Sequence, residues 1–452
     1  MTPAPRPRLL DLPRLARALE AADPTPLTGT VVRATGLLVE ATLPRVPVGT
    51  SCEIHANDGS LVRAEVVGFQ GGTARLMPLA EIHGVAEGCE VVPRAAADRL
   101  AVGEELLGRV VDGDLRPVDG GPAPLLHHRT ALHASPPPAL QRRRVSQPLS
   151  LGIRSIDACL TVGEGQRLAI LAGPGVGKSV LLGMLARSSQ AEVVVVGLVG
   201  ERGREVREFI ERDLGAGLAR SVVVVATSNE SPLKRLRAAM SATAAAEHFR
   251  AQGRKVLLLM DSLSRVAQAQ REIGLAAGEP PTTKGYPPSA FALLPRLVER
   301  AGNDAGPGSI TAFYTVLAEG DDATGDPIAD AARATLDGHI MLARKLAESG
   351  HFPSVDVLAS VSRVMNDIVT PAHRELARES REVLAAYRDA ADLIEVGAYA
   401  AGSNPRVDRA IACIEPLRRF LRQEPEERSP LPETLARLAR LLAPAEKEKA
   451  HA

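Results

Sequence analysis

Residues 172–179 read AGPGVGKS and stand between an apolar run, residues 168–171, and a stretch with helical character. Glycines in such a turn let successive backbone N–H groups point into one concavity, and the following helix presents its positive N-terminus. Both features favour bound phosphate. Lys178 is placed to reach β- and γ-phosphates, and the hydroxyl of Ser179 is placed to ligate Mg²⁺. The pattern therefore predicts a nucleoside triphosphate site, whose residues are Gly173, Pro174, Gly175, Val176, Gly177, Lys178, Ser179 and Val180.

Acidic residues follow other apolar runs of the chain. Asp261 comes directly after residues 256–260, and Glu201 lies just beyond residues 193–199. Because the carboxyl ends of parallel strands meet at one edge of a sheet, we expect both carboxylates near the phosphate loop. Asp261 is the expected Walker B carboxylate, holding Mg²⁺ through water. Glu201 is placed to orient or deprotonate the water that attacks the γ-phosphate.

Arginines are candidates for the cation that meets charge on the γ-phosphate oxygens. Arg202 is placed either to hold Glu201 or to bridge to a neighbouring subunit, and the alternative is a solvated ion-pair network that opens a helix. Arg363 ends residues 353–363 and lies late enough in the chain to serve an adjacent subunit's nucleotide. Its alternative is a structural hydrogen bonder in a serine-rich turn, and the residues alone leave this choice open.

The bulk composition limits the classes of partner. The 452 residues carry 54 Lys and Arg against 54 Asp and Glu, so no global positive field indicates a nucleic acid or membrane partner. The four cysteines are far apart and form no CxxC pair, which favours a reduced, cytosolic setting. We find no signal-peptide pattern and no apolar run near the roughly 18 residues of a membrane span.

The organisation of the chain predicts an α/β nucleotide-binding core between smaller domains. Short β-like runs with a hairpin signal at residues 57–59 predict a small β-barrel. Apolar strands that alternate with helical patterns predict a parallel sheet covered on both faces. The leading helix either packs on its own domain or docks to a partner. The expected divisions are an N-terminal helix, a β-barrel, a core with a Gly/Pro-rich connector at 98–150, and a helical domain, at residues 1–27, 28–97, 98–364 and 365–452.

Several of these segments together resemble the ATPase of flagellar and type III protein-secretion systems, a family similar to the α and β subunits of rotary ATP synthases. They are GEGQR (163–167), AGPGVGKS, GERGREVREFIE (200–211), LLLMDSLSRVAQAQREIGLAAGEPP (257–281), GYPPSAFALLPRLVERAG (285–302) and LDGHIMLARKLAESGHFPSVD (336–356). The resemblance covers residues 28–423. It implies a β-barrel, a RecA-like P-loop domain and a helical domain in a homohexamer, with ATP at the subunit interfaces.

The resemblance also implies roles for single residues. Lys178 and Ser179 take phosphate and Mg²⁺, Glu201 is the catalytic carboxylate, and Arg363 is an arginine finger that acts in trans. Phe352 matches the aromatic that stacks on adenine. Pro174 departs from the family, where a small Ser or Ala is common. The segment 320–330 is slightly longer than the usual form.

The partners and location that the family implies are those of a motor for protein export. They are a peripheral-stalk regulator at the N-terminal helix, a central stalk protein, membrane proteins of the export gate and chaperone–substrate complexes. The chain is expected in the cytoplasm, at the inner face of the cytoplasmic membrane. The sequence does not separate a flagellar from an injectisome system.

Other functions remain as alternatives. A rotary ATP synthase subunit is disfavoured by the Pro-rich segment 278–288, which resembles the export family, and because one chain carries both Glu201 and Arg363. A termination-factor-like RNA helicase is disfavoured by the zero net charge and the aromatic-poor barrel. A non-enzymatic scaffold is excluded only if Glu201 and Lys178 are functional.

Overall fold

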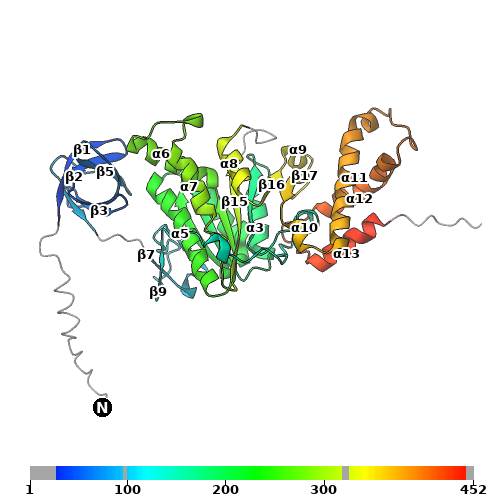
Figure 1. The fold of residues 1–452 in the computed structure, drawn as a ribbon, viewed down its shortest axis with the longest axis horizontal. Coiled ribbons are helices and arrows are strands. Elements are labelled where there is room, and N and C mark those ends of the chain that lie inside the picture. Colours follow the sequence, from blue (N-terminus) through cyan, green and yellow to red (C-terminus); the bar gives the residue numbers. More distant parts are fainter. Residues whose placement is uncertain (1–26, 95–98, 318–324, 444–452) are drawn as a thin grey trace, which may run out of the picture. The chain divides into compact units, whose positions relative to one another are not determined.

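The computed structural model describes residues 27–94, 99–317 and 325–443. The chain divides into two compact units between residues 97 and 98, and each is described by itself. The predicted N-terminal helix lies outside the described residues, and so do residues 320–324 of the segment 320–330 that is longer than the usual form. Figure 1 labels many of the elements by which both units are described.

The first unit is a closed β-barrel. Within residues 27–94 the barrel strands lie in the order β1-β2-β5-β4-β3-β6, which confirms the barrel prediction. Alternate side chains fill the interior, as for Cys52 and Ile54 of β3, which are 0% exposed. The strand bounds are β1 (Gly29–Thr35), β2 (Leu38–Thr42), β3 (Ser51–His55), β4 (Leu61–Gln70), β5 (Thr73–Pro78) and β6 (Glu90–Pro93).

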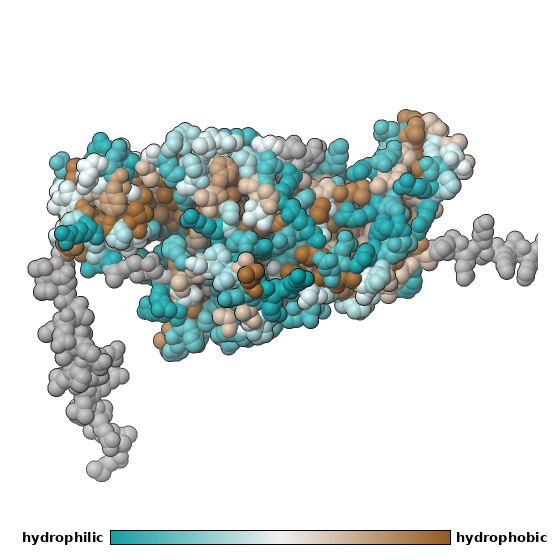
Figure 2. Space-filling model, in the orientation of Figure 1, coloured by the Kyte–Doolittle hydropathy of each residue, from teal (hydrophilic) through white to brown (hydrophobic). Residues whose placement is uncertain are grey.

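Large apolar side chains are also exposed on the outside of this barrel. Figure 2 shows hydrophobic residues gathered on the barrel, whereas the face around α11 and α12 is mostly hydrophilic. Exposed apolar surface of this kind is typical of a contact with another protein. The exposed barrel residues are Leu27, Val32, Leu37, Val48, Leu61 and Phe69.

The second unit is built on a mainly parallel sheet. Among the described residues its path runs β17-β16-β10-β15-β13-β11-β12-β8, with β14 paired to β15 beside it. Among the described strands of this sheet, only the β17 and β14 pairings are antiparallel. The strands are β8 (Arg109–Val111), β10 (Arg167–Ala172), β11 (Val193–Glu201), β12 (Ser221–Thr227), β13 (Lys255–Asp261), β14 (Gly302–Asn303), β15 (Ser309–Leu317), β16 (Gly338–Leu342) and β17 (Val355–Ser362), while β7 (Arg99–Val102) and β9 (His128–Ala131) pair separately.

Helices cover both faces of this sheet. Alternate residues of β11 pack into different cores: Val193 and Val195 into one, Val194 and Val196 into the other. The first core includes side chains of α5 to α8, and the second includes those of α2, α3 and α11 to α13. The helices are α2 (Arg154–Cys159), α3 (Lys178–Ser188), α4 (Gly203–Glu208), α5 (Pro232–Ala251), α6 (Leu263–Ala277), α7 (Pro288–Val298), α8 (Pro327–Thr335), α9 (Arg344–Glu348), α10 (Met365–Ile368), α11 (Pro371–Glu395), α12 (Pro405–Leu421) and α13 (Leu431–Leu442).

The C-terminal part is helical, as the sequence predicts. The Thr370 hydroxyl accepts a hydrogen bond from the His373 N–H, and Pro371 occupies the first turn of α11, so the helix begins where the Thr-Pro pair indicates. Figure 1 shows α11 and α12 as a hairpin beside α13. Among the described residues, no helix combines the length and apolar character that a membrane crossing requires.

The structure corrects the reading of the segment before Arg363. The alternative for Arg363 placed the preceding residues in a serine-rich turn, but residues 355–362 form β17, whose buried residues include Val355 and Val357. The expected connector also supplies β8, which pairs with β12 in the main sheet.

Candidate active site

The phosphate loop joins β10 to α3. Gly175 and Gly177 have φ angles of 77° and 87°, in the left-handed region that glycine adopts without strain. A Cβ built at Gly175 meets no heavy atom within 4 Å, so the mouth of the loop is open. The Ser354 hydroxyl donates a hydrogen bond to the Val176 carbonyl at 2.6 Å, which fixes the turn of the loop. Ser179 lies half-buried in the first turn of α3.

The sequence-predicted charged residues meet at this edge of the sheet. Nζ of Lys178 lies 2.6 Å from Oδ1 of Asp261 and 3.6 Å from Oε1 of Glu201. β10, β13 and β11 all end here, with β15 between the first two. The structure thus brings Lys178, Asp261 and Glu201 together as expected from parallel strand ends.

Thr315 of β15 belongs to the same cluster and was not predicted. Its hydroxyl donates to Oδ1 of Asp261 at 2.6 Å, and the residue is 0% exposed. The only sequence signal is a hydroxyl residue near the carboxyl end of an apolar run. Asp261 therefore accepts hydrogen bonds from both Lys178 and Thr315.

The charges of the cluster set its proton affinity. Burial and the negative charge of Asp261 raise the pKa of Glu201 to about 7, although Lys178 opposes the shift. Burial lowers the pKa of Lys178, but the charges of Asp261 and Glu201 outweigh it and raise that pKa above its ordinary value. A carboxylate whose pKa lies near neutral pH is suited to accept a proton from water at that pH.

A cavity of about 460 Å³ lies beside the phosphate loop. The Phe352 ring lines it and is 44% exposed, and a Cβ built at Gly177 would lie 3.4 Å from that ring. An exposed aromatic face beside a phosphate loop fits a nucleotide base, because rings stack on one another. Other lining residues are Val180, Leu181, Met184 and the segment 422–425.

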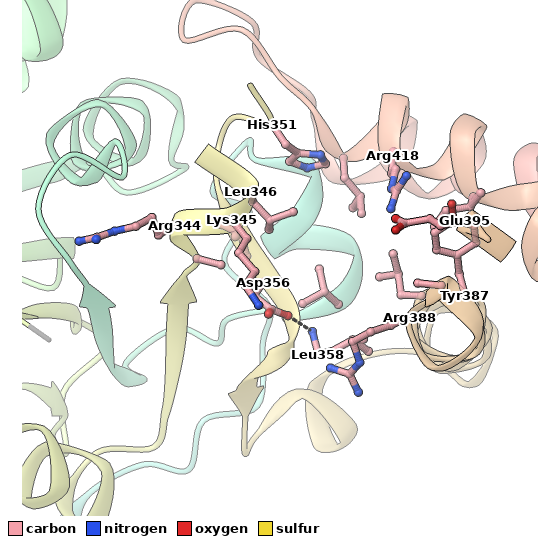
Figure 3. Close-up of a pocket in the computed structure, with 17 residues that line it drawn as sticks. Arg344, Lys345, Leu346, His351, Asp356, Leu358, Tyr387, Arg388, Glu395 and Arg418 are labelled. Atoms are coloured by element: carbon pink, nitrogen blue, oxygen red, sulfur yellow. Dashed lines mark hydrogen bonds between the residues drawn. The ribbon is translucent and has the colours of Figure 1, made fainter. Parts of the chain in front are cut away.

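The residue before Phe352 lines a different cavity, drawn in Figure 3, of about 450 Å³ between β17 and the helices α11 and α12. His351 is 4% exposed, and burial, with the nearby charges of Arg422 and Arg418, lowers its pKa to about 4. His351 is therefore neutral at physiological pH. Figure 3 shows Arg344 pointing away from Tyr387 and Arg418, which lie on the helical side.

Arg363 lies at the opposite end of the strands from Lys178. β16 is parallel to β10 and pairs Leu342 with Ala172, whereas antiparallel β17 pairs Ser362 with Gly338. At about 3.3 Å per residue, Arg363 is roughly 16 Å along the strands from the phosphate loop. Its side chain is exposed and donates to the Arg333 carbonyl at 3.0 Å.

Arg202 follows Glu201 in the chain, and its side chain pairs with Glu205. It occupies the N-cap position of α4, its side chain is 82% exposed, and its Nη1 lies 3.5 Å from Oε1 of Glu205. This geometry is that of the ion pair at a helix start, which was the alternative for this residue.

Comparison with known proteins agrees with each part of this fold. The ATP synthase alpha/beta family matches through its beta-barrel domain at residues 31–94 and its nucleotide-binding domain at residues 152–362. The T3SS EscN ATPase C-terminal domain matches residues 369–440.

Similar proteins come from flagellar and secretion systems. A flagellum-specific ATP synthase of Pseudomonas aeruginosa is 53% identical over 420 residues, which cover 92% of this chain and 93% of the relative. A type 3 secretion system ATPase of Sinorhizobium fredii is 46% identical over 450 residues, covering 98% and 99%. The assembled ATPase EscN of enteropathogenic E. coli superposes with a TM-score of 0.87 at 42% identity, covering 92% of this chain and 100% of that one. The chain therefore belongs to the family of flagellum-specific ATP synthases and type III secretion ATPases.

Proposed function

We propose that this ATPase energises protein export through a flagellar or injectisome type III apparatus, releasing substrates from chaperones and unfolding them. Its copies form a homohexamer in which each nucleotide lies between neighbouring copies. The observation that carries this proposal is the placement of Lys178 and Arg363 at opposite edges of one sheet. A complete site then needs Arg363 from an adjoining copy, as in a closed head-to-tail ring. The exposed apolar side chains of the barrel support such an assembly.

The residues at the phosphate loop take these roles. Lys178 and the loop N–H groups hold the phosphates of ATP, and Phe352 stacks on adenine. Glu201 accepts a proton from the attacking water, which the raised pKa of its carboxyl supports. Ser179 and Asp261 fit Mg²⁺, which uses one or two carboxylates and substrate phosphates and would neutralise phosphate charge.

The partners follow from relatives of this chain. EscN has been solved in complex with its central stalk EscO, and that structure superposes on this chain with a TM-score of 0.85. We infer a corresponding central stalk here, with a peripheral-stalk regulator at residues 1–27, export-gate membrane proteins, chaperone–substrate complexes and no nucleic acid. The protein would work in the cytoplasm, at the inner face of the cytoplasmic membrane. The proposed domains are residues 28–97, 98–364 and 365–452 after the N-terminal helix.

Mixing two inactive variants tests the shared site. Lys178→Ala removes the phosphate lysine, and Arg363→Ala removes the finger, so each variant alone is expected to hydrolyse ATP very slowly. In randomly mixed rings, about a quarter of the interfaces combine an intact Lys178 with an intact Arg363 from the neighbour. Dissociation and reassembly of the mixture should therefore restore up to about a quarter of the wild-type rate.

The same mixture has an outcome that contradicts the proposal. If both residues served one nucleotide within one chain, every chain in the mixture would lack one of them and no activity would return. Lys255→Ala is a suitable control for Lys178→Ala, because Lys255 pairs with Glu164 at the other end of the sheet. It should retain activity alone.

A further inference from the structure

The segment Arg422 to Glu427 forms one wall of the cavity beside Phe352. It is an irregular stretch between α12 and α13. Hydrogen bonds to other parts of the chain hold it at the cavity. The Gln423 N–H donates to the Phe352 carbonyl at 2.9 Å, which ties this wall directly to the aromatic residue. Whatever fixes Gln423 therefore also fixes the backbone of Phe352.

Gln423 is buried, and its side chain is fully engaged by the protein itself. Its Oε1 accepts from the Arg154 N–H at 2.9 Å, and its Nε2 donates to the carbonyls of Gly152 and Glu427 at 2.7 and 2.8 Å. These bonds satisfy the amide internally, so it has no need of a base as a partner. Its role is to join the wall to the start of α2.

Arg154 holds the same wall from its other side. The guanidinium is 3% exposed, donates to the Phe420 carbonyl at 2.6 Å and to the Arg422 carbonyl, and forms a two-pronged pair with the Glu427 carboxylate. This charged pair lowers the pKa of Glu427 below its ordinary value. α3 adds one further tie, since Arg187 donates to the Pro425 carbonyl at 2.7 Å.

We propose that Arg154 and Gln423 are positioning residues for the base of the nucleotide: they fix the wall 422–427 and, through it, Phe352. This inference rests on the proposed role of Phe352 as the adenine platform. Their contacts run to the base side of the cavity, whereas the contacts of Lys178 run to Asp261 and Glu201 on the phosphate side. Disturbing Arg154 therefore weakens the hold on the base and leaves the phosphate cluster in place.

The variant Arg154→Lys tests this separation. Lysine keeps the charge but lacks the planar fork that serves two carbonyls and a carboxylate at once. We expect the KM for ATP to rise about three- to tenfold with kcat changed less than about twofold, because the base contacts are made in the ground state and the transition state alike. Inorganic tripolyphosphate, which carries phosphates without a base, should inhibit the variant and the wild type with the same Ki.

Arg300→Lys is the matched control. Arg300 is 2% exposed, forms a two-pronged pair with Glu247 and donates to the Leu132 carbonyl, but it lies in the other core of the sheet. It should lose thermal stability to a similar degree as Arg154→Lys without a rise in KM. A milder variant, Glu427→Gln, removes one charge at a partly exposed position and should raise the KM by a smaller factor.

The outcomes separate the possible failures. An unchanged KM in Arg154→Lys and Glu427→Gln overturns the positioning role, and so does a Ki for tripolyphosphate that rises as much as the KM. An equal rise of KM in Arg300→Lys overturns it too, because general loosening would then explain the effect. If tripolyphosphate fails to compete with ATP in the wild type, the proposed phosphate site itself is wrong.

Discussion

The catalytic candidates lie at the two opposite ends of the strands of the central sheet, and they differ in how buried their side chains are. At the carboxyl ends of the parallel strands, Lys178, Glu201 and Asp261 are held against one another in a partly buried cluster, in which the pKa values of Lys178 and Glu201 are raised. At the other edge, Arg363 presents an exposed side chain with a carbonyl partner. In the first arrangement every charged side chain is paired within one chain. In the second, the exposed Arg363 side chain is free to contact a neighbouring chain.

The exposed arginine nevertheless stands on a fixed backbone. The Arg363 N–H donates to the Asp337 carbonyl at 3.0 Å, and the Asp337 carboxylate accepts from the N–H and Nε of Arg167, each at 3.1 Å. Arg167 begins β10, the strand that ends at the phosphate loop. The two ends of the sheet therefore differ in the exposure of their side chains, because the backbone at both ends is fixed by β10.

The largest expected effect comes from removing the exposed arginine. Arg363→Ala should lower kcat by about 10³-fold, because a finger of this kind stabilises charge on the transferring phosphoryl group. Nucleotide affinity should change little, because such a finger acts mainly on charge that develops in the transition state. Steady-state hydrolysis and equilibrium binding of labelled ATP measure both quantities.

Arg374→Ala is the control for this substitution. Arg374 is also exposed and also donates to a backbone carbonyl, that of Asn366. Its removal should leave kcat within a few-fold of the wild type. Near-normal turnover by Arg363→Ala would show that Arg363 does not act as an arginine finger.

At the buried edge, Glu201→Gln should lower kcat by about 10²-fold, because the amide cannot accept the proton that general base catalysis transfers. ATP should bind at least as well, since the change removes a negative charge near Lys178 and the phosphates. Binding and turnover measured on one preparation separate these effects. If the variant turned over at the wild-type rate, the base would have to be another group.

The shifted pKa of Glu201 predicts a pH dependence. The base works when deprotonated, and its pKa is raised to about 7, so kcat/KM should fall about tenfold per unit as the pH drops below that value. His351 does not explain a fall in kcat/KM near pH 7, because its pKa is lowered to about 4. A carboxylate with an ordinary pKa would instead leave kcat/KM flat down to about pH 5.

Much of the buried edge was predictable from the sequence. Long apolar runs indicate β10, β11 and β13, and their common direction brings Lys178, Glu201 and Asp261 to one edge without knowledge of any side-chain contact. β8 was missed because three residues within a Gly/Pro-rich stretch carry little periodicity. β17 was missed because its serines interrupt the apolar pattern.

The sequence did not predict contacts between residues far apart in the chain. Arg154 meets Gln423 and Glu427 some 270 positions later, and no periodic pattern relates such segments. Likewise, the place of Arg363 along the strands follows from the antiparallel pairing of β17 with β16, a strand that the sequence did not predict.

The smallest expected effect compares the ends of a single strand, β15. Thr315 donates to Asp261 at the catalytic edge, and Thr311 accepts from the Gly165 N–H at 2.9 Å at the other edge. Valine has nearly the same shape as threonine but no hydroxyl, so Thr315→Val and Thr311→Val each remove that short bond and a longer one, to the Met260 carbonyl at 3.4 Å and the Gly163 carbonyl at 3.5 Å respectively. We expect each to cost about 1 kcal/mol.

Both variants should therefore lower the free energy of unfolding alike. Only Thr315→Val should also reduce kcat, by about threefold to tenfold, because Asp261 then relies on Lys178 alone among these donors and draws it away from the phosphates. Chemical denaturation and steady-state kinetics on both proteins make the comparison. If Thr311→Val slowed turnover as much as Thr315→Val, stability rather than the charge cluster would govern the rate, and the edges would be equivalent in this respect.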